Sequence, residues 1–376
     1  MSRYSCYALR RVLMLCLVAC ACLWHATLLL PQDTAQPDAS ESKGKVRLEY
    51  CGTDGLRRTS PQEISTLESV YVSYGTTITA DDIAFLATLA NAKDLHMGGD
   101  LSDEYVSIEG SLAPLSKMKN LQNVALCKKD VCDEDLAFVA GLPAIESLEL
   151  VCDTNPYGED GPSVTDDCAL HLSKATTLRN LDIIRGDKLT DQFVSLIARE
   201  LKSLESLRMQ SDFLTDKSLQ ILADKCPNLR WLDLHSNHFT DKGVGHLAIA
   251  KKMEMLWLSS KSLTCDCVSA VSGLVHLRHL GLTVPTIDDD GVKTIAERPG
   301  LEVLALRQPA LSDNQFAMFS HHPTLRSAYL NGHDLSTTKV LQVIQTIPTL
   351  NHLEVRENKS LQSAVNRFLA KRKATD

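Results

Sequence analysis

The sequence lacks the residue patterns that mark the common catalytic and nucleotide-binding sites. It contains no phosphate-binding glycine loop, no His-Glu-x-x-His motif, no nucleophile elbow and no matched pair of catalytic acids. Its histidines do not recur as i, i+4 pairs, and the three acids at 288–290 fit a helix start better than a metal cluster. We therefore expect a protein that is not an enzyme and that uses no metal, cofactor or small-molecule substrate.

Aromatic residues and excess positive charge are also scarce. Aromatic side chains make up 5% of the chain, so the 44% hydrophobic content falls mainly on Leu, Ile, Val and Ala, which suits thin repeated layers. The formal net charge is −8, and the first thirty residues contain three arginines and no acid, so the remainder is more acidic still. This charge argues against a nucleic-acid partner and favours a basic one. The alternative is that the charge only keeps a long chain soluble.

One pattern recurs along the chain: Leu-x-x-Leu-x-Leu, a short polar run, an apolar residue, Ser/Thr-Asp, and a helical stretch. Successive copies are 24 to 26 residues apart, and they begin at Leu178, Leu204, Leu229, Met253, Leu277, Leu301, Leu325 and Leu350. Weaker copies precede them, for a total of about a dozen units within the period known for leucine-rich repeats. A chain of such units can exceed the size of a single globular core, because each unit packs only on its neighbours.

Each unit predicts one short strand and one helix. The alternation in Leu-x-Leu places the leucines on one face of a strand and the intervening residue on the other. Thr-Asp pairs such as Thr190-Asp191, Thr215-Asp216 and Thr240-Asp241 are helix starts, because Thr can accept from the first unpaired amides and the acid favours the positive helix end. We expect an α/β solenoid with parallel strands on one side and helices on the other.

The segment from Ile221 to Leu234, with Cys226-Pro227-Asn228-Leu229 at its centre, resembles the cysteine-containing, ribonuclease-inhibitor-like subclass of leucine-rich repeats. The resemblance covers roughly residues 65 to 360, and the Thr-Asp helix starts resemble repeats of secreted bacterial proteins. It implies a horseshoe whose strands line the concave face, where the ligand usually binds. Most units depart from the family by lacking an Asn after the strand, although Asn237 is present.

The first thirty residues form a targeting segment. Residues 12–30 are apolar apart from His25 and Thr27, and arginines precede them. They are either a cleaved signal peptide or a signal anchor that spans the membrane; a third possibility is lipidation at Cys20. The positive-inside rule then places the repeats outside the cytoplasm, membrane-anchored or secreted. Residues 31–45 are too polar to fold and are predicted to be a disordered linker, followed by the repeat domain with its terminal caps at 46–376.

The cysteines after the targeting segment permit disulfides in an exported domain. Cys152 and Cys168 lie on either side of an insertion, which follows Cys152 and runs to residue 162, and are the first candidate pair, although Cys127 and Cys132 could bridge to them instead. Cys226 is predicted to be a buried free thiol. The lone Cys265-x-Cys267 motif fits a capping turn better than a zinc site.

The candidate binding residues are those between and beside the strand leucines, where side chains should form columns on the concave face. Trp231 and Trp257 occupy such positions in consecutive repeats and resemble an interface hot spot. The full candidate set is Trp231, Asp233, His235, Met255, Trp257, His279, Arg307 and Tyr329. The alternative is that these side chains only cover one another.

These features together predict an exported, membrane-tethered module that binds a protein partner through its concave face. A competing hypothesis is a substrate-recognition protein of a ubiquitin ligase, although residues 31–66 are too short and polar for the F-box-like module that this requires. Two further hypotheses are a structural component of the cell envelope and an unrecognised hydrolase.

Overall fold

The computed structural model describes residues 46–50, 67–72, 77–98, 106–128, 131–152 and 164–374, with the backbone alone at 46–50 and 307. They belong to one compact unit, Val46–Asp376. The targeting segment, the linker, Cys20 and the insertion after Cys152 lie outside the described residues. In the part of the chain that is described, no helix is both long and apolar enough to span a membrane.

Thirteen strands of the described residues form one parallel sheet. In sheet order they are β1 (Val46–Tyr50), β2 (Leu67–Val72), β4 (Asp94–Met97), β6 (Asn123–Lys128), β7 (Ser147–Cys152), β8 (Asn180–Ile184), β9 (Ser206–Gln210), β10 (Trp231–His235), β11 (Met255–Ser259), β12 (His279–Thr283), β13 (Val303–Ala310), β14 (Ser327–Asn331) and β15 (His352–Arg356). A second sheet pairs β3 (Thr77–Ile78) with β5 (Ser107–Ile108). The strand order follows the chain order, as expected when each repeat packs on the next.

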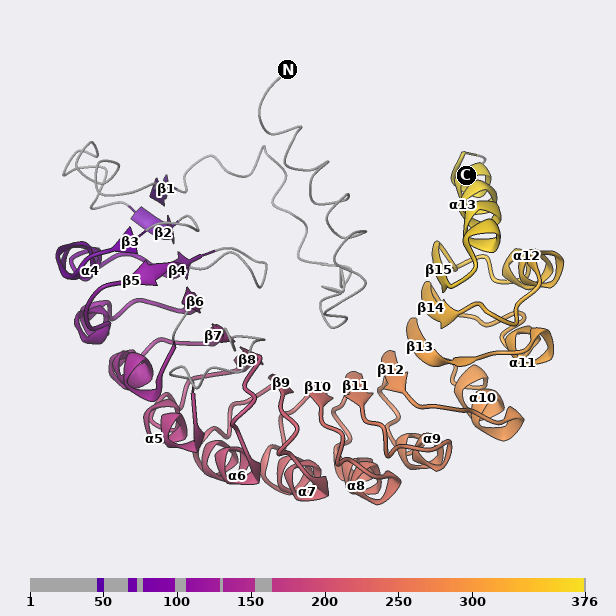
Figure 1. The fold of residues 1–376 in the computed structure, drawn as a ribbon, viewed down its shortest axis with the longest axis horizontal. Helices are drawn as coiled ribbons and strands as arrows, with labels where there is room; N and C mark the ends of the chain where they lie inside the picture. Colours follow the sequence, from indigo (N-terminus) through magenta and orange to yellow (C-terminus); the bar gives the residue numbers. More distant parts are fainter. Residues whose placement is uncertain are drawn as a thin grey trace. The chain divides into compact units, whose positions relative to one another are not determined.

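A layer of helices follows the strands on the outer side of the curved repeat unit (Figure 1). The α-helices are α4 (Ala80–Leu86), α5 (Ala169–Leu172), α6 (Asp191–Glu200), α7 (Asp216–Lys225), α8 (Asp241–His246), α9 (Asp266–Val271), α10 (Asp289–Ala296), α11 (Asp313–Ala317), α12 (Thr337–Gln345) and α13 (Lys359–Lys373). Short 3₁₀ helices are η2 (Ala113–Lys117), η3 (Asp133–Gly141), η4 (Asp166–Cys168) and η5 (Leu247–Ile249). The predicted α/β solenoid, with strands on the concave side and helices on the convex side, is confirmed.

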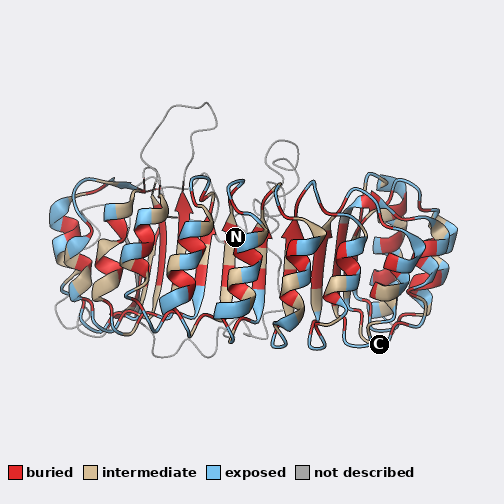
Figure 2. Ribbon diagram, turned by 90° about the horizontal axis from the view of Figure 1, so that it is seen from below, coloured by how far each residue is buried: buried red, intermediate tan, exposed pale blue. Residues whose placement is uncertain are grey.

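The core lies between the two layers, where the leucines of the strands meet the apolar side of each helix. Strand residues alternate between buried and partly exposed, as in β9 and β10. On the helices, the side turned to the sheet is buried and the outer side is exposed (Figure 2). This arrangement follows from a period of two on the strands and about 3.6 on the helices. One continuous apolar cluster runs through the repeats as a result.

The Thr-Asp motif connects neighbouring repeats as well as starting helices. Asp216, the first residue of α7, accepts from the backbone N–H of Thr240 through Oδ1 at 2.8 Å and from its hydroxyl through Oδ2 at 2.6 Å. The same double contact joins Asp191 to Thr215. It recurs for four further pairs, Asp133–Thr165, Asp166–Thr190, Asp241–Thr264 and Asp313–Ser336. Each aspartate therefore fixes the start of the helix in the following repeat.

Buried serines hold the turn after each of three central strands. Ser211 donates to the carbonyl of Leu189 at 2.7 Å, and Ser236 donates to that of Leu214 at 2.6 Å. Ser260 makes the equivalent bond to Phe239. Asn237, at the position where the family resemblance expects Asn, instead bonds Asp212 near the surface. Serine one position earlier satisfies the loop carbonyls in these repeats, which explains why they can lack the asparagine.

The expected bridge between Cys152 and Cys168 is not formed, because both residues are buried free thiols. Burial raises the pKa of the Cys152 thiol to about 12 and also raises that of Cys168. Both side chains therefore act as small apolar groups. Cys127 and Cys132 are free as well, and the prediction of a buried free thiol at Cys226 is confirmed. Cys265 lies at the N-cap of α9, in agreement with a capping turn.

Candidate binding surface on the concave face

The parallel register aligns the outward residues of neighbouring strands in columns across the concave face. The first column contains Ser206, Trp231, Met255 and His279; the second contains Arg208, Asp233, Trp257 and Gly281; the third contains Gln210, His235, Ser259 and Thr283. Met255 and His279 share a column with Trp231, and Asp233 shares one with Trp257, as the sequence predicts. The role of these residues in binding stays a prediction.

Trp231 is the most accessible of the candidate aromatic residues. Its exposed fraction is 36%, whereas Met255 and His279, the next two residues of its column, are only partly exposed. Burial lowers the pKa of the His279 imidazole, so this side chain is neutral at pH 7. The first column therefore presents an uncharged strip, with Trp231 as its most exposed residue.

Trp257 lies across the neighbouring strand instead of projecting freely from the sheet. A Cβ added to Gly281 on β12 would lie 2.5 Å from Cδ2 and 2.7 Å from Cε2 of the Trp257 indole. Real Cβ atoms do not approach other atoms this closely, so glycine is what lets the ring lie flat over this strand. The indole is consequently half-buried and contributes both to packing and to the concave surface.

Three other candidates lie on or near the same face. His235 is 4.0 Å from Asp212 through Nε2, and burial lowers its pKa. Tyr329 packs against His352, with ring centroids 5.2 Å apart. Arg307 belongs to β13, but its side chain lies outside the described residues. Tyr329 is three strands away from Trp257, so the candidates form a central group and an outlying one.

The charged neighbours of Asp233 in the second column were missed from the sequence. Arg208 contacts Asp182 on one side, Nη1 to Oδ2 at 3.4 Å, and Asp233 on the other, Nε to Oδ2 at 3.3 Å. Glu149 precedes Asp182 in the same column. We call Glu149, Asp182, Arg208 and Asp233 the charged column. The sequence pattern could have indicated the charged column, because each of its residues is the x of a Leu-x-Leu or equivalent unit.

Burial dominates the electrostatics of the charged column. It raises the pKa of the Asp182 carboxyl to about 6, against the opposing effect of Arg208. Burial alone would lower the pKa of Arg208, but the charges of Asp182 and Asp233 outweigh it and raise that pKa. Asp182 and Asp233 thus share one guanidinium.

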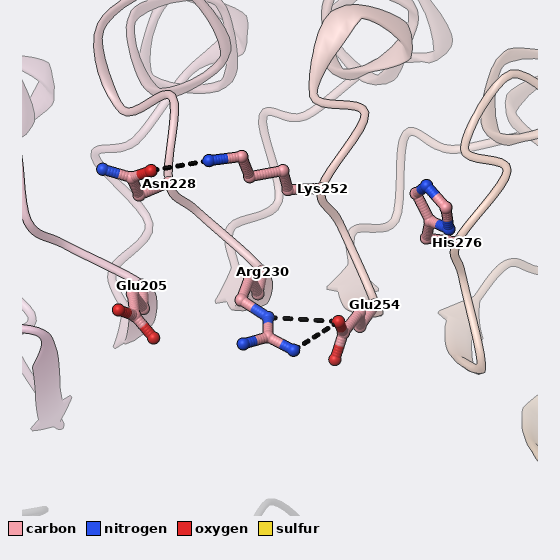
Figure 3. A pocket seen from close by; sticks show the side chains of 6 residues that line it. All are labelled: Glu205, Asn228, Arg230, Lys252, Glu254 and His276. Carbon is pink, nitrogen blue, oxygen red and sulfur yellow. Dashed lines mark hydrogen bonds and ion pairs between the residues drawn. The ribbon is translucent and has the colours of Figure 1, made fainter.

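A second charged row follows the edge of the sheet where the strands begin. Acids and bases alternate there, and Arg230 donates to Glu254 through Nε at 3.1 Å and through Nη2 at 2.5 Å. Figure 3 shows this pair and the bond that Lys252 donates to Asn228. These side chains line a shallow depression of about 350 Å³. Further pairs are Glu68–Lys93, Arg179–Glu205 and Arg278–Glu302. Because these exposed charges are mutually paired, the depression has little charge left for a ligand.

Across the described residues, no group of three or more His, Cys, Asp or Glu side chains is placed to hold a metal ion. The described cysteines with a pKa shift are all shifted upward, burial being the largest cause, so none is activated as a nucleophile. The concave face presents two indoles, the partly exposed first column and the charged column.

No protein-family model matches the chain, and no curated protein matches it. Among solved structures, it is similar to an internalin (InlF) from Listeria monocytogenes, with 20% identity over 81% of this chain and 80% of that chain and a TM-score of 0.51. A leucine-rich-repeat protein of Leptospira interrogans has 17% identity over 83% and 78% of the two chains, with a TM-score of 0.44. Yeast Rad7, in its complex with Elc1, has 18% identity over 65% and 64%, with a TM-score of 0.45. The repeated strand–helix units and the likeness to the internalin show that the fold is a leucine-rich-repeat solenoid.

Proposed function

We propose that this chain is a protein-binding module and that a partner docks on the concave face around Trp231 and Trp257. The observation that carries the proposal is the presence of two indoles on adjacent strands, β10 and β11, one of them 36% exposed. Large aromatic residues at the centre of an open surface are the typical energetic centres of protein interfaces. The absence of any recognised catalytic motif in the sequence is consistent with this role.

Trp231→Ala is expected to weaken capture of the partner at least tenfold while the circular dichroism of the protein stays unchanged. Trp231 is the appropriate position because its loss exposes no core, whereas Trp257 also packs on Gly281. A partner would first be identified by proximity labelling from the full chain and then tested by pull-down with the purified variant. A loss of about 2 kcal/mol or more is typical of an interface hot spot.

The matched control is Ile249→Ala, which removes a large apolar side chain from η5 in the outer helical layer. Ile249 is 58% exposed, so its removal is also harmless to the core. We expect this variant to capture the partner as well as the parent chain does. If both variants bind equally well, the concave hot spot is disproved.

We further propose that the repeats function outside the cytoplasm, delivered by the segment at 12–30. The support is that segment's apolar length and the arginines before it. Lys217 is exposed on α7, so Lys217→Cys offers an accessible thiol. Intact cells that express this variant should react with a membrane-impermeant maleimide as fully as permeabilised cells do. Labelling only after permeabilisation would contradict export. The chain without the substitution measures the background labelling of its own cysteines.

A further inference from the structure

The rim of the sheet where the strands begin carries acids and arginines in strict alternation. Each is the first x of a Leu-x-x-Leu or equivalent unit, and the backbone N–H of each donates to the carbonyl of its equivalent in the preceding repeat at 2.7–2.8 Å. We call this row the charged rim, and from β7 to β14 it consists of Glu146, Arg179, Glu205, Arg230, Glu254, Arg278, Glu302 and Arg326. Figure 3 shows three successive members, Glu205, Arg230 and Glu254. The neutral amides Gln122 and Asn351 adjoin the row at its two ends.

A row of eight alternating charges is complementary to its own reverse. A second copy related by a two-fold axis places the first residue of the row against the eighth and the second against the seventh, so that each facing pair joins an acid to an arginine. Each of these pairs is made twice, and they are Glu146–Arg326, Arg179–Glu302, Glu205–Arg278 and Arg230–Glu254. The row has no net charge, so it does not favour a single ion but fits a surface with the same alternation.

The curvature of the solenoid permits this pairing along the whole row. The repeats form an open arc with the strands on its inner side (Figure 1). A two-fold axis that lies in the plane of the rim and bisects the arc maps the arc onto itself in reverse order. Two copies therefore lie rim to rim with matching curvature over the length of the row, about 34 Å at a strand spacing of about 4.8 Å.

The two residues at the ends of the charged rim are the least satisfied by their own chain. Glu146 is exposed, and its carboxylate makes no hydrogen bond or ion pair with any residue that the structure describes. Arg326 is 61% exposed and reaches Glu302 only at 3.7 Å, from Nε to Oε2, while Oε1 of Glu302 pairs with Arg278 at 2.7 Å. The two-fold axis brings Glu146 of one copy to Arg326 of the other, which gives each the close partner that its own chain does not provide.

The residues beside the charged rim do not oppose this contact. Two positions before each member of the row, the repeats carry Ala144, Thr177, Ser203, Asn228, Lys252, His276, Gly300 and Thr324. The same axis places Lys252 against Asn228, the residue to which Lys252 donates at 2.8 Å within one chain. It places His276 against Ser203, so no like charges meet. The depression of about 350 Å³ between Arg230 and Glu254 lies at the axis itself.

We propose that the charged rim binds a second copy of this chain through a two-fold axis that passes between Arg230 and Glu254. The contact is separate from the partner site of the proposed function and stands or falls independently of it. Trp231 directly follows Arg230, so the Trp231 residues of the two copies lie on either side of the axis. The two concave faces then adjoin and form one wider surface.

The test measures self-association of the full chain by sedimentation velocity, in a non-ionic detergent that keeps the apolar segment at 12–30 in solution without adding charge. We expect the parent chain to dimerise at low salt. Its dissociation constant should rise about tenfold between about 0.05 and 0.5 M NaCl, because salt screens the facing charges. A parent chain that stays monomeric at about 100 µM in low salt would overturn the proposal, since even weak specific complexes form at that concentration.

Charge reversal at the ends of the row tests the two-fold arrangement itself. Glu146→Arg and Arg326→Glu should each weaken the homodimer at least tenfold, because like charges then meet at both ends. An equimolar mixture of the two variants should form a heterodimer with about the parent affinity, since opposite charges face each other again at both ends. The double variant Glu146→Arg/Arg326→Glu should form a homodimer for the same reason.

The matched control is Asp224→Arg, which makes the same change in net charge at an exposed position of α7 in the outer helical layer. We expect it to dimerise as the parent chain does. Dimers that survive both single reversals, or a mixture that stays monomeric, would rule out the charged rim as the contact. An equal loss in Asp224→Arg would trace the effect to net charge and would also rule it out.

Discussion

Arg208→Ala is expected to lower the free energy of unfolding by about 3 kcal/mol at pH 8, because it removes the guanidinium that contacts both Asp182 and Asp233. Asp182 and Asp233 then repel each other on a partly desolvated surface. Urea unfolding followed by circular dichroism measures the loss. Hydrogen exchange should place it in β8 to β10, the strands that carry Asp182, Arg208 and Asp233.

The free energy of unfolding that Arg208→Ala loses should become smaller as the pH falls. The folded pKa of Asp182 is about 6, above its ordinary value of 3.8, so the folded state takes up a proton before the unfolded state does. Stability linked to this group is therefore fully present below pH 3.8 and declines as the pH rises through 6. Without Arg208 the folded pKa rises further, because the attraction that lowers it is lost. The variant is expected to approach the parent chain in stability near pH 5.

Arg230→Ala is the matched control, since Arg230 lies next to the same group of strands and also pairs with an acid. It is 47% exposed in its pair with Glu254, and exposed pairs contribute about 0–1 kcal/mol. Arg208→Ala should lower the free energy of unfolding clearly more than Arg230→Ala does. The double variant Arg208→Ala/Asp182→Asn should recover part of that free energy. Equal costs for the two arginine variants would mean that the charged column is an ordinary solvated surface.

The strands and their columns could be predicted from sequence because they depend on local alternation. A leucine at every second position determines which residues face the core, and a period near 24 residues aligns the strands. Trp231, Met255 and His279 therefore lie in one column, as the pattern requires. The same logic applied to Glu149, Asp182 and Arg208 would have found the charged column, but isolated charges between leucines resemble any solvated strand face.

Contacts between repeats were less predictable. The acid of each Thr-Asp pair was expected to favour its own helix end, yet its carboxylate mainly accepts from the Thr of the following repeat. The cysteine of the resembling subclass is also not a repeating feature. The turn that follows each helix identifies the residue equivalent to Cys226 in the later repeats. These residues are Ala250, Leu274, Arg298, His322 and Ile347. Arg298 uses this position to donate to carbonyls of the preceding repeat, which no motif signals.

Phe239→Ala is the second substitution with a large expected effect, a loss of about 3–5 kcal/mol in the free energy of unfolding. Phe239 is fully buried in the turn between β10 and α8, so its truncation leaves a cavity in the core. Because each repeat contacts only its neighbours, the damage should be local. Hydrogen exchange should accelerate in β9 to β11 and in α7 to α9, while α12 and α13 keep their protection.

Phe239→Leu supplies the control, and the chain itself predicts its outcome. Phe239 precedes Thr240, the N-cap residue of α8. The residue before the N-cap is leucine in most other repeats, including Leu189, Leu214, Leu263, Leu311 and Leu335. A leucine is therefore compatible with the backbone and the surrounding packing of this position, so the loss should stay under about 1.5 kcal/mol. A loss as large as that of the alanine variant would show that the repeats are not equivalent in their packing, and that Phe239 fills a space specific to this part of the solenoid. A small loss would show that the central repeats, which carry the concave tryptophans, are built to the same plan as the rest.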